Sequence, residues 1–202
     1  MKDYNKIFKL FVGNDDLRPK MHHPFRYKDY WCATDAHAMV YIPVDIADVE
    51  HSEETINCSP FIPPQVTCHH VVNVADFKSK LIVELVPDET DCEECDGSGV
   101  VEYEYDGKDI SDTQTLDCPL CNGHGTITNS KKLVPNVYAN FRYKGVVFSY
   151  RNLIKLVSAC EEMGEETFTV IHLDARKASY FKVAELTILI MPVMNDNYTE
   201  IQ

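Results

Sequence analysis

A cysteine–glycine pattern occurs twice in this chain of 202 residues and constrains its fold more than any other feature. The first copy begins at Cys92 and reads CEECDGSG, and the second begins at Cys118 and reads CPLCNGHG. In each copy, two cysteines three positions apart can bind one ion from a tight turn, and the glycines let backbone N–H groups point at the sulfurs. Four thiolates complete a closed tetrahedral shell. We therefore predict a structural zinc site formed by Cys92, Cys95, Cys118 and Cys121.

The residues between the two copies alternate as in a β-hairpin. Apolar or aromatic residues at 101, 103 and 105 alternate with glutamates at 102 and 104, and the dipeptide Asp106-Gly107, which is typical of a type I′ turn, follows them. The sequence thus predicts a β-hairpin closed at its base by zinc. A disulfide pair and a redox-active CxxC motif are the alternatives to zinc at these cysteines.

The repeated pattern resembles the cysteine-rich module of DnaJ-type chaperones, which contains four copies for two ions. Two copies here imply one zinc ion per chain. We expect residues 88–127 to form a zinc-knuckle hairpin, inserted into a discontinuous domain of residues 1–87 and 128–202.

The acidity of the chain is concentrated in this insertion. Residues 88–117 contain 12 acidic side chains against Lys108 alone, which accounts for −11 of the formal net charge of −13. Such a surface repels phosphates, so we expect a basic protein partner in preference to nucleic acid. A solvated protrusion with no partner explains the same charge equally well.

The composition is that of a globular protein, with 45% hydrophobic and 10% aromatic residues. No run approaches the roughly 18 consecutive apolar residues that a membrane span requires, and no signal peptide opens the sequence. We therefore expect a cytoplasmic protein with no membrane contact. The other four cysteines are scattered, mostly in apolar surroundings, and are expected to be reduced thiols: Cys32, Cys58, Cys68 and Cys160.

Two stretches outside the insertion have a similar order of elements. In the second, a strand closes at 146–148, a helix is capped by Ser149 and Gly164, and three strands follow. In the first, a helix expected over Asp3–Gly13 precedes three strands. The expected strands are 21–27, 30–34 and 38–43 in the first stretch, and 167–173, 178–183 and 186–193 in the second. Residues 45–66 are expected to be irregular, and Asn73 to cap a further helix.

The sequence therefore predicts an α+β fold made of two βαβββ halves, the first with a weaker initial strand. Three segments are similar to the bacterial DNA polymerase III β sliding clamp. Residues 31–41 (WCATDAHAMVY) resemble the clamp's ATDGHRLA turn, residues 188–194 (ILIMPVM) its C-terminal VVMPM, and residues 148–163 its strand and helix. The chain departs from the clamp at Ala36 and Ala38, where the motif has glycine and arginine. It also has material for one domain, where a clamp subunit has three.

The resemblance implies an apolar pocket that takes a short peptide motif of partner proteins. Matched position by position, it implies five pocket residues: Thr34, His37, Met39, Leu189 and Met191. Methionine suits such a role because its unbranched thioether can repack around different side chains. The alternative is that these residues are ordinary core.

The resemblance implies a non-enzymatic, clamp-like accessory protein of DNA replication or repair that acts through protein contacts. The alternative is a chaperone-like polypeptide-binding zinc knuckle on a clamp-like scaffold. Cys32, Asp35 and His37 are close in sequence, but no oxyanion hole accompanies them, and a hydrogen-bonded turn explains the last two. Contact with DNA should be weak for a monomer, because Arg151 and Lys155 are followed in their helix by glutamates.

Overall fold

The computed structural model describes residues 2–62, 64–106 and 111–201 and divides them between two units. The first unit comprises the residues before Val83 and after Asn136, and the second comprises Val83–Asn136. Among the helices described, none is both long and apolar enough to cross a membrane.

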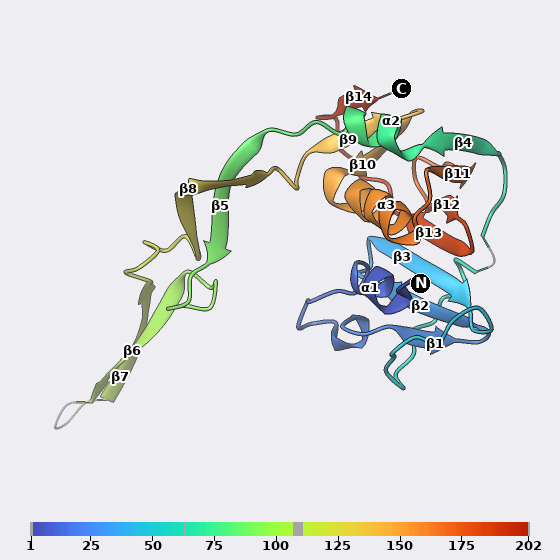
Figure 1. Cartoon of the computed structure of the whole chain (residues 1–202). Helices are drawn as coiled ribbons and strands as arrows, with labels where there is room; N and C mark the ends of the chain where they lie inside the picture. The colour runs from blue at the N-terminus through green and yellow to red at the C-terminus, as the bar shows by residue number, and fades with distance from the viewer. Residues whose placement is uncertain (1, 63, 107–110, 202) are drawn as a thin grey trace. The chain divides into compact units, whose positions relative to one another are not determined.

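A seven-stranded sheet forms the centre of the first unit (Figure 1). Every neighbouring pair in it is antiparallel. Strands from the two parts of the chain meet twice in this sheet. One meeting is between β3 (Ala38–Pro43) and β13 (Leu186–Ile190), with Met39 directly opposite Leu189, and the other is between β4 (His70–Asn73) and β11 (Thr167–His172). In spatial order the strands are β1 (Phe25–Tyr27), β2 (Tyr30–Thr34), β3 (Ala38–Pro43), β13 (Leu186–Ile190), β12 (Ser179–Val183), β11 (Thr167–His172) and β4 (His70–Asn73).

A smaller sheet of three strands completes the first unit. Its order is β10 (Val146–Ser149), β9 (Asn140–Tyr143) and β14 (Thr199–Ile201). The strands β9 and β10 are antiparallel, whereas β14 is parallel to β9.

Helix α3 (Tyr150–Met163) follows β10 directly and packs against β10, β12 and β13. Ser149 caps its start by accepting a hydrogen bond from the N–H of Asn152, and Gly164 ends it in the left-handed conformation with φ 70°. Leu153, Leu156 and Val157 form its buried face.

The two shorter helices, α1 (Tyr4–Lys9) and α2 (Val74–Lys80), both contact α3. Lys6 of α1 lies 2.5 Å from Glu162, and Lys78 of α2 lies 2.6 Å from Glu161. The glutamates at the end of α3 therefore pair with the neighbouring helices. A 3₁₀ helix, η1 (Pro19–Met21), lies between α1 and β1.

The irregular segment 45–66 covers part of the large sheet. Its Ile56, Cys58 and Phe61 pack against a cluster that includes Met39 and Leu189. The segment was expected to be irregular, but its packing role was not expected.

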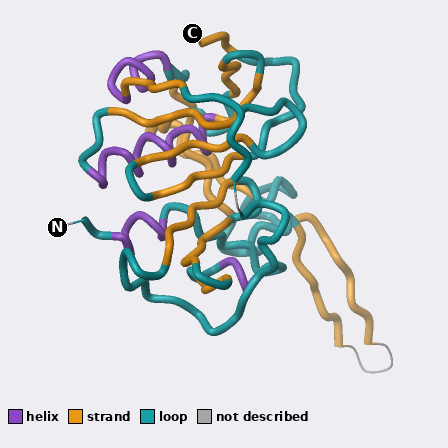
Figure 2. The backbone as a smooth tube through the Cα atoms, turned by 90° about the vertical axis from the view of Figure 1, so that its right-hand side faces the viewer, coloured by secondary structure: helices purple, strands orange, loops and turns teal. Residues whose placement is uncertain are grey.

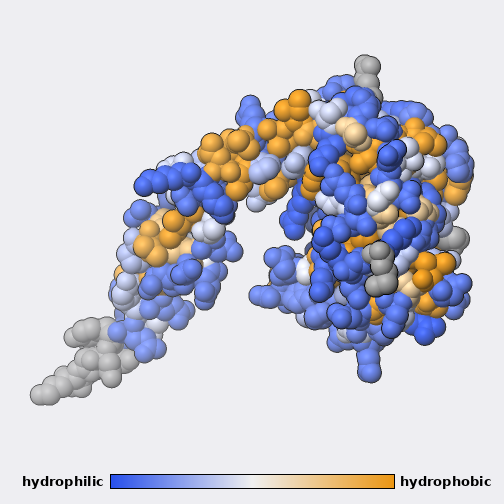
Figure 3. Space-filling model, viewed as in Figure 1, coloured by the Kyte–Doolittle hydropathy of each residue, from blue (hydrophilic) through white to orange (hydrophobic). Residues whose placement is uncertain are grey.

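In the second unit, β5 (Leu85–Asp91) pairs with β8 (Thr126–Pro135), and β6 (Val100–Asp106) pairs with β7 (Ser111–Asp117), both antiparallel. Figure 2 shows β6 and β7 running side by side. The unit is wider than the expected insertion at 88–127, because β5 and β8 extend their pairing to Leu85 and Pro135. Figure 3 shows exposed apolar side chains along this pairing, where Leu85 and Leu133 lie. The expected Asp106-Gly107 turn lies partly outside the described residues.

Several expected elements are confirmed and others need correction. The structure reproduces β2 and β3 at the expected bounds. Helix α1 ends at Lys9 instead of Gly13, whose N–H donates to Met21 O, and β1 begins at Phe25 because the residues before it contain the 3₁₀ turn. In the described residues no strand precedes α1, so the first half is αβββ. Strand β4 was not predicted.

Candidate metal centre and ligand pocket

The four cysteines of the repeated pattern meet in the second unit. Their sulfur atoms all lie within 4.8 Å of one another, and their side chains are buried. Cys92 Sγ is 3.8 Å from Cys118 Sγ, and Cys95 Sγ is 3.8 Å from Cys121 Sγ. A disulfide bond would require about 2.05 Å, so neither pair is bonded. Four buried cysteines in this arrangement could hold a metal ion.

The glycines give the two copies the same backbone path. Gly99 N–H donates to Cys95 Sγ at 3.2 Å, and Gly125 N–H donates to Cys121 Sγ at the same distance. Both glycines are left-handed, with φ of 77° and 76°. These are the N–H···S contacts that the sequence pattern predicts.

The two copies also bond to each other with the same symmetry. Cys92 N–H donates to Gly125 O at 2.8 Å, and Cys118 N–H donates to Gly99 O at 2.8 Å. A Cβ atom added to Gly99 would lie 2.4 Å from Gly123 O, and one added to Gly125 would lie 2.3 Å from Gly97 O. The last glycine of each copy is therefore needed for the close approach of the other copy.

The thiols of Cys92 and Cys118 have different proton affinities. Burial raises the pKa of Cys92 to about 11. A hydrogen bond from the backbone of Cys121, helped by that of Leu120, lowers the pKa of Cys118 to about 7 despite burial. Cys118 is thus the more readily ionised partner of this pair.

The structure separates the five predicted pocket residues into two groups. Thr34, Met39 and Leu189 are buried in the sheet. Thr34 Oγ1 donates to Ala38 O at 2.8 Å and accepts from Ala36 N–H, so this hydroxyl holds the β2–β3 turn.

His37 and Met191 are brought together at the edge of a cavity. Met191 N–H donates to His37 O at 2.8 Å, and both side chains line a pocket of about 420 Å³. His37 is exposed and Met191 is half-buried. The pocket is bounded by the β2–β3 turn, the residues leading into β9, the first turn of α3 and the residues after β13.

The turn itself is ordered by Asp35. Its Oδ1 accepts hydrogen bonds from the N–H groups of His37 and Ala38, and its Oδ2 lies 2.5 Å from Lys155 Nζ. Ala36 has φ 74°, the left-handed conformation that the glycine of the clamp motif adopts more readily.

Cys32 is not an exposed nucleophile. It is buried in β2, and its hydrogen bond with Cys58, together with burial, raises the pKa of its thiol far above the usual value. The adjacent histidines His22-His23 and His69-His70 belong to no metal-binding cluster among the described residues. His22 Nε2 instead lies 2.9 Å from Asp15 O.

Sequence reasoning missed Asn152 at the third position of α3. Only 5% of its surface is exposed, and it lines the same pocket as His37 and Met191. An amide within an otherwise apolar helix face, next to Leu153, was the available signal.

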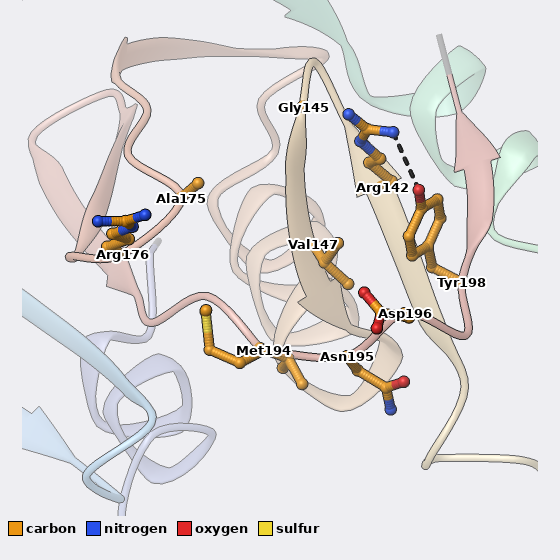
Figure 4. A pocket seen from close by; sticks show the side chains of 10 residues that line it. Arg142, Gly145, Val147, Ala175, Arg176, Met194, Asn195, Asp196 and Tyr198 are labelled. Carbon is orange, nitrogen blue, oxygen red and sulfur yellow. Dashed lines mark hydrogen bonds between the residues drawn. The ribbon is translucent and has the colours of Figure 1, made fainter.

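A second cavity of about 410 Å³ contains Arg142 and Arg176 (Figure 4). Arg142 donates to Tyr198 Oη at 2.9 Å and lies 3.8 Å from Glu200. The positive charge of Arg142 is therefore partly balanced by Glu200 within the protein.

No protein-family model matches the sequence. No curated protein matches it either. Among solved structures, the chain is similar to the DNA polymerase III β chain of Streptococcus pneumoniae TIGR4, with 13% identity and a TM-score of 0.50, over 95% of this chain and 62% of that chain. It is also similar to the β sliding clamp of C. crescentus, with 7% identity and a TM-score of 0.50, over 96% of this chain and 64% of that chain. The chain thus spans less than two thirds of the length of these proteins. At such identities the likeness concerns architecture alone, and the chain has a fold like that of bacterial DNA polymerase sliding clamps.

Proposed function

We propose that the four cysteines bind one structural Zn²⁺ ion per chain. Four sulfurs at the usual Zn–S distance of about 2.3 Å in a tetrahedron lie about 3.8 Å apart. The sulfur atoms of Cys92 and Cys118 are 3.8 Å apart, as are those of Cys95 and Cys121, so the donor set fits. When bound, the ion would contribute folding energy to a DnaJ-type zinc knuckle at 88–127 within the discontinuous domain of 1–87 and 128–202. With four thiolate ligands it would leave no position for substrate.

For the whole chain we propose a non-enzymatic, sliding-clamp-like accessory role in DNA replication or repair, exerted through protein contacts in the cytoplasm. The neighbours in structure are DNA polymerase sliding clamps. The observation that carries the proposal is the pocket that joins His37 to Met191, because these residues belong to the two motifs that resemble the clamp. The cysteines outside the repeated pattern are free thiols, which suits a reducing compartment.

In this role the pocket would accept a short peptide of a partner protein. Met191 and His37 would contact it, while Thr34, Met39 and Leu189 support the pocket from the sheet. The acidic second unit would favour a partner with a basic surface elsewhere.

The test is a titration of a fluorescent clamp-binding peptide onto the full chain loaded with zinc. We expect specific binding that Met191→Ala weakens at least about tenfold, as for a buried contact at the centre of an interface. Met194→Ala is the matched control, since Met194 is exposed and lies outside this pocket. Absence of binding by the unmodified protein at high micromolar concentration would reduce His37 and Met191 to structural residues.

A second candidate is polypeptide binding by the β6–β7 pair. Tyr103 and Leu116 are about half exposed there, while Glu102 and Glu104 alternate with the apolar positions of β6. A pull-down separates the candidates: replication proteins would support the clamp-like role, whereas unfolded polypeptides retained only by the zinc-loaded protein would support the second.

A further inference from the structure

The pocket that contains His37 and Met191 is built around the first turn of α3, a helix of 14 residues. Of the first-turn N–H groups, that of Tyr150 donates to Ala139 O and that of Asn152 donates to Ser149 Oγ. Within the described residues the N–H of Arg151 has no such partner. The helix dipole adds a partial positive charge at this end.

Asn152 provides a second and independent observation. Only 5% of the surface of Asn152 is exposed, and the residue lines the pocket. No hydrogen bond joins its side-chain amide to another residue that the structure describes, and the amide atoms are not among the fully buried polar atoms that lack a partner, so they keep some accessible surface. Because Asn152 lines the pocket, a ligand atom bound there can complete the bonding of this unpaired amide.

The charges around the pocket favour an anion. Asp35 lines it, but its carboxylate is held by Lys155 at 2.5 Å, and the two side chains are only 7% and 11% exposed. Arg151 also lines the pocket, and the structure gives it no acidic partner among the described residues. Its guanidinium therefore supplies a positive charge that the pocket does not neutralise.

Beside the neutral polar lining of His37, Tyr138, Asn140, Ser149 and Asn195, the pocket has an apolar part that narrows the class of ligand. The apolar part consists of Val137, Met191, Pro192 and Val193. A single cation beside an apolar wall suits one carboxylate on a short apolar peptide, whereas a nucleic-acid backbone requires several cations in a row.

We infer that the pocket binds a peptide with apolar side chains through one carboxylate, held at the start of α3 by Arg151 and the Asn152 amide. The peptide part of this inference rests on the proposed function, whereas the carboxylate site can be tested without it. A carboxylate here would accept charge-assisted bonds from the guanidinium and from the N–H groups of the helix terminus.

The first experiment compares two fluorescent apolar pentapeptides that differ in the C-terminal group alone, a free carboxylate against an amide. We expect the acid to bind the zinc-loaded full chain about tenfold more tightly, the ratio for one hydrogen-bonded charge. Asn152→Asp should remove this preference, because it places a negative charge at the site in nearly the same shape, and an acid in the first turn is compatible with helix formation. Arg151→Gln should reduce the preference about threefold, whereas Arg176→Gln, which makes the same charge change in the other cavity, should preserve it.

The second experiment follows the Asn152 side-chain amide by NMR during titration with sodium acetate. We expect its resonances to shift in the unmodified protein and in Arg176→Gln, and to shift less in Arg151→Gln. If acetate produces the shift but neither pentapeptide binds, the carboxylate site stands and the peptide-binding function fails.

Two results would overturn the inference. One is equal affinity for acid and amide peptides with no acetate shift, which would leave an apolar pocket without an anion site. The other is a larger response of Asn152 to short duplex DNA than to the peptide acid, which would assign the donors to a phosphate instead.

Discussion

Lys155 Nζ lies 2.5 Å from Asp35 Oδ2, and this buried ion pair joins helix α3 to the turn between β2 and β3. The same turn carries His37, and the same helix carries Asn152. The pair therefore fixes the distance between two walls of the pocket.

Removing one partner of this pair should destabilise the first unit. Lys155→Met leaves Asp35 charged and buried, for which a cost of about 3 kcal/mol in unfolding free energy is expected. Lys78→Met breaks an exposed pair with Glu161 and should cost less than about 1 kcal/mol. Both unfolding free energies can be measured by urea titration. The probe is the fluorescence of the single tryptophan, Trp31, which is buried in β2. Equal losses of unfolding free energy in the two variants would show that the buried pair contributes no more stability than the exposed pair.

The same pair predicts how stability depends on pH. Burial alone would raise the pKa of Asp35, but the hydrogen bond and charge of Lys155, together with the N–H groups of Ala38 and His37, bring it below the usual value. A lowered folded pKa contributes stability that is fully present above the unfolded value of about 3.9 and is lost as pH falls through the folded value.

We therefore expect the unfolding free energy of the first unit to fall below about pH 4. The double variant Asp35→Asn/Lys155→Met should show a shallower fall over this window when Trp31 fluorescence is the probe. Parallel pH profiles for the two proteins would contradict this assignment.

Metal analysis of freshly purified protein should give one zinc per chain. Cys92→Ser removes one of four ligands and should abolish stoichiometric zinc and unfold the zinc-dependent part of the second unit. The Trp31 transition of the first unit should remain. Cys68→Ser is the control, because Cys68 lies in the first unit and should leave the zinc content unchanged. Reduction-sensitive bonds among the four cysteines of the repeated pattern would overturn the zinc hypothesis.

Two glycines of one copy should respond differently to alanine. Gly97 and Gly99 have similar left-handed φ values of 80° and 77°, so both substitutions carry a backbone cost of about 1 kcal/mol. Only the Cβ at position 99 meets backbone, 2.4 Å from Gly123 O, whereas that at position 97 lies 3.4 Å from the Asp91 side chain. Competition with a chelator should therefore show a further loss of zinc affinity, about tenfold or more, for Gly99→Ala alone. Similar affinities for both variants would mean that the two copies are not closely packed in solution.

A single chain should bind duplex DNA weakly or not at all at physiological salt. Of the basic residues near the start of α3, Lys155 is paired with Asp35, and Arg142 of β9 is held by Tyr198 and Glu200. Too few cations remain to neutralise several phosphates. Anisotropy titrations combined with sedimentation test this. Micromolar binding by a monomer would contradict it, and binding by a ring-like oligomer alone would support a clamp that encloses DNA.

Local signals in the sequence predicted much of this structure. Ser149 and Gly164 marked both ends of α3, because caps depend on a few adjacent residues. The repeated cysteines predicted the sulfur cluster for the same reason, since the turn chemistry lies within eight residues.

The features that were missed depend on contacts between distant segments. Strand β4 forms by pairing with β11, about 100 residues later in the chain. Packing of Phe61 onto the sheet and the position of Asn152 in a cavity follow from tertiary structure, which no local period encodes. The resemblance to sliding clamps named His37 and Met191, but it could not separate them from Met39 and Leu189, which the fold buries.

The reciprocal packing of the two cysteine–glycine copies limits how this region can evolve. Each copy supplies the carbonyl that the other copy's first cysteine needs, and the last glycine of each leaves room for a backbone carbonyl of the other. A single copy would therefore lack two of the four sulfur ligands and the backbone acceptor for its first cysteine. A substitution that shifts the backbone of one copy therefore also disturbs the hydrogen bonds of the other, so a change tolerated by one copy alone is not necessarily tolerated by the pair.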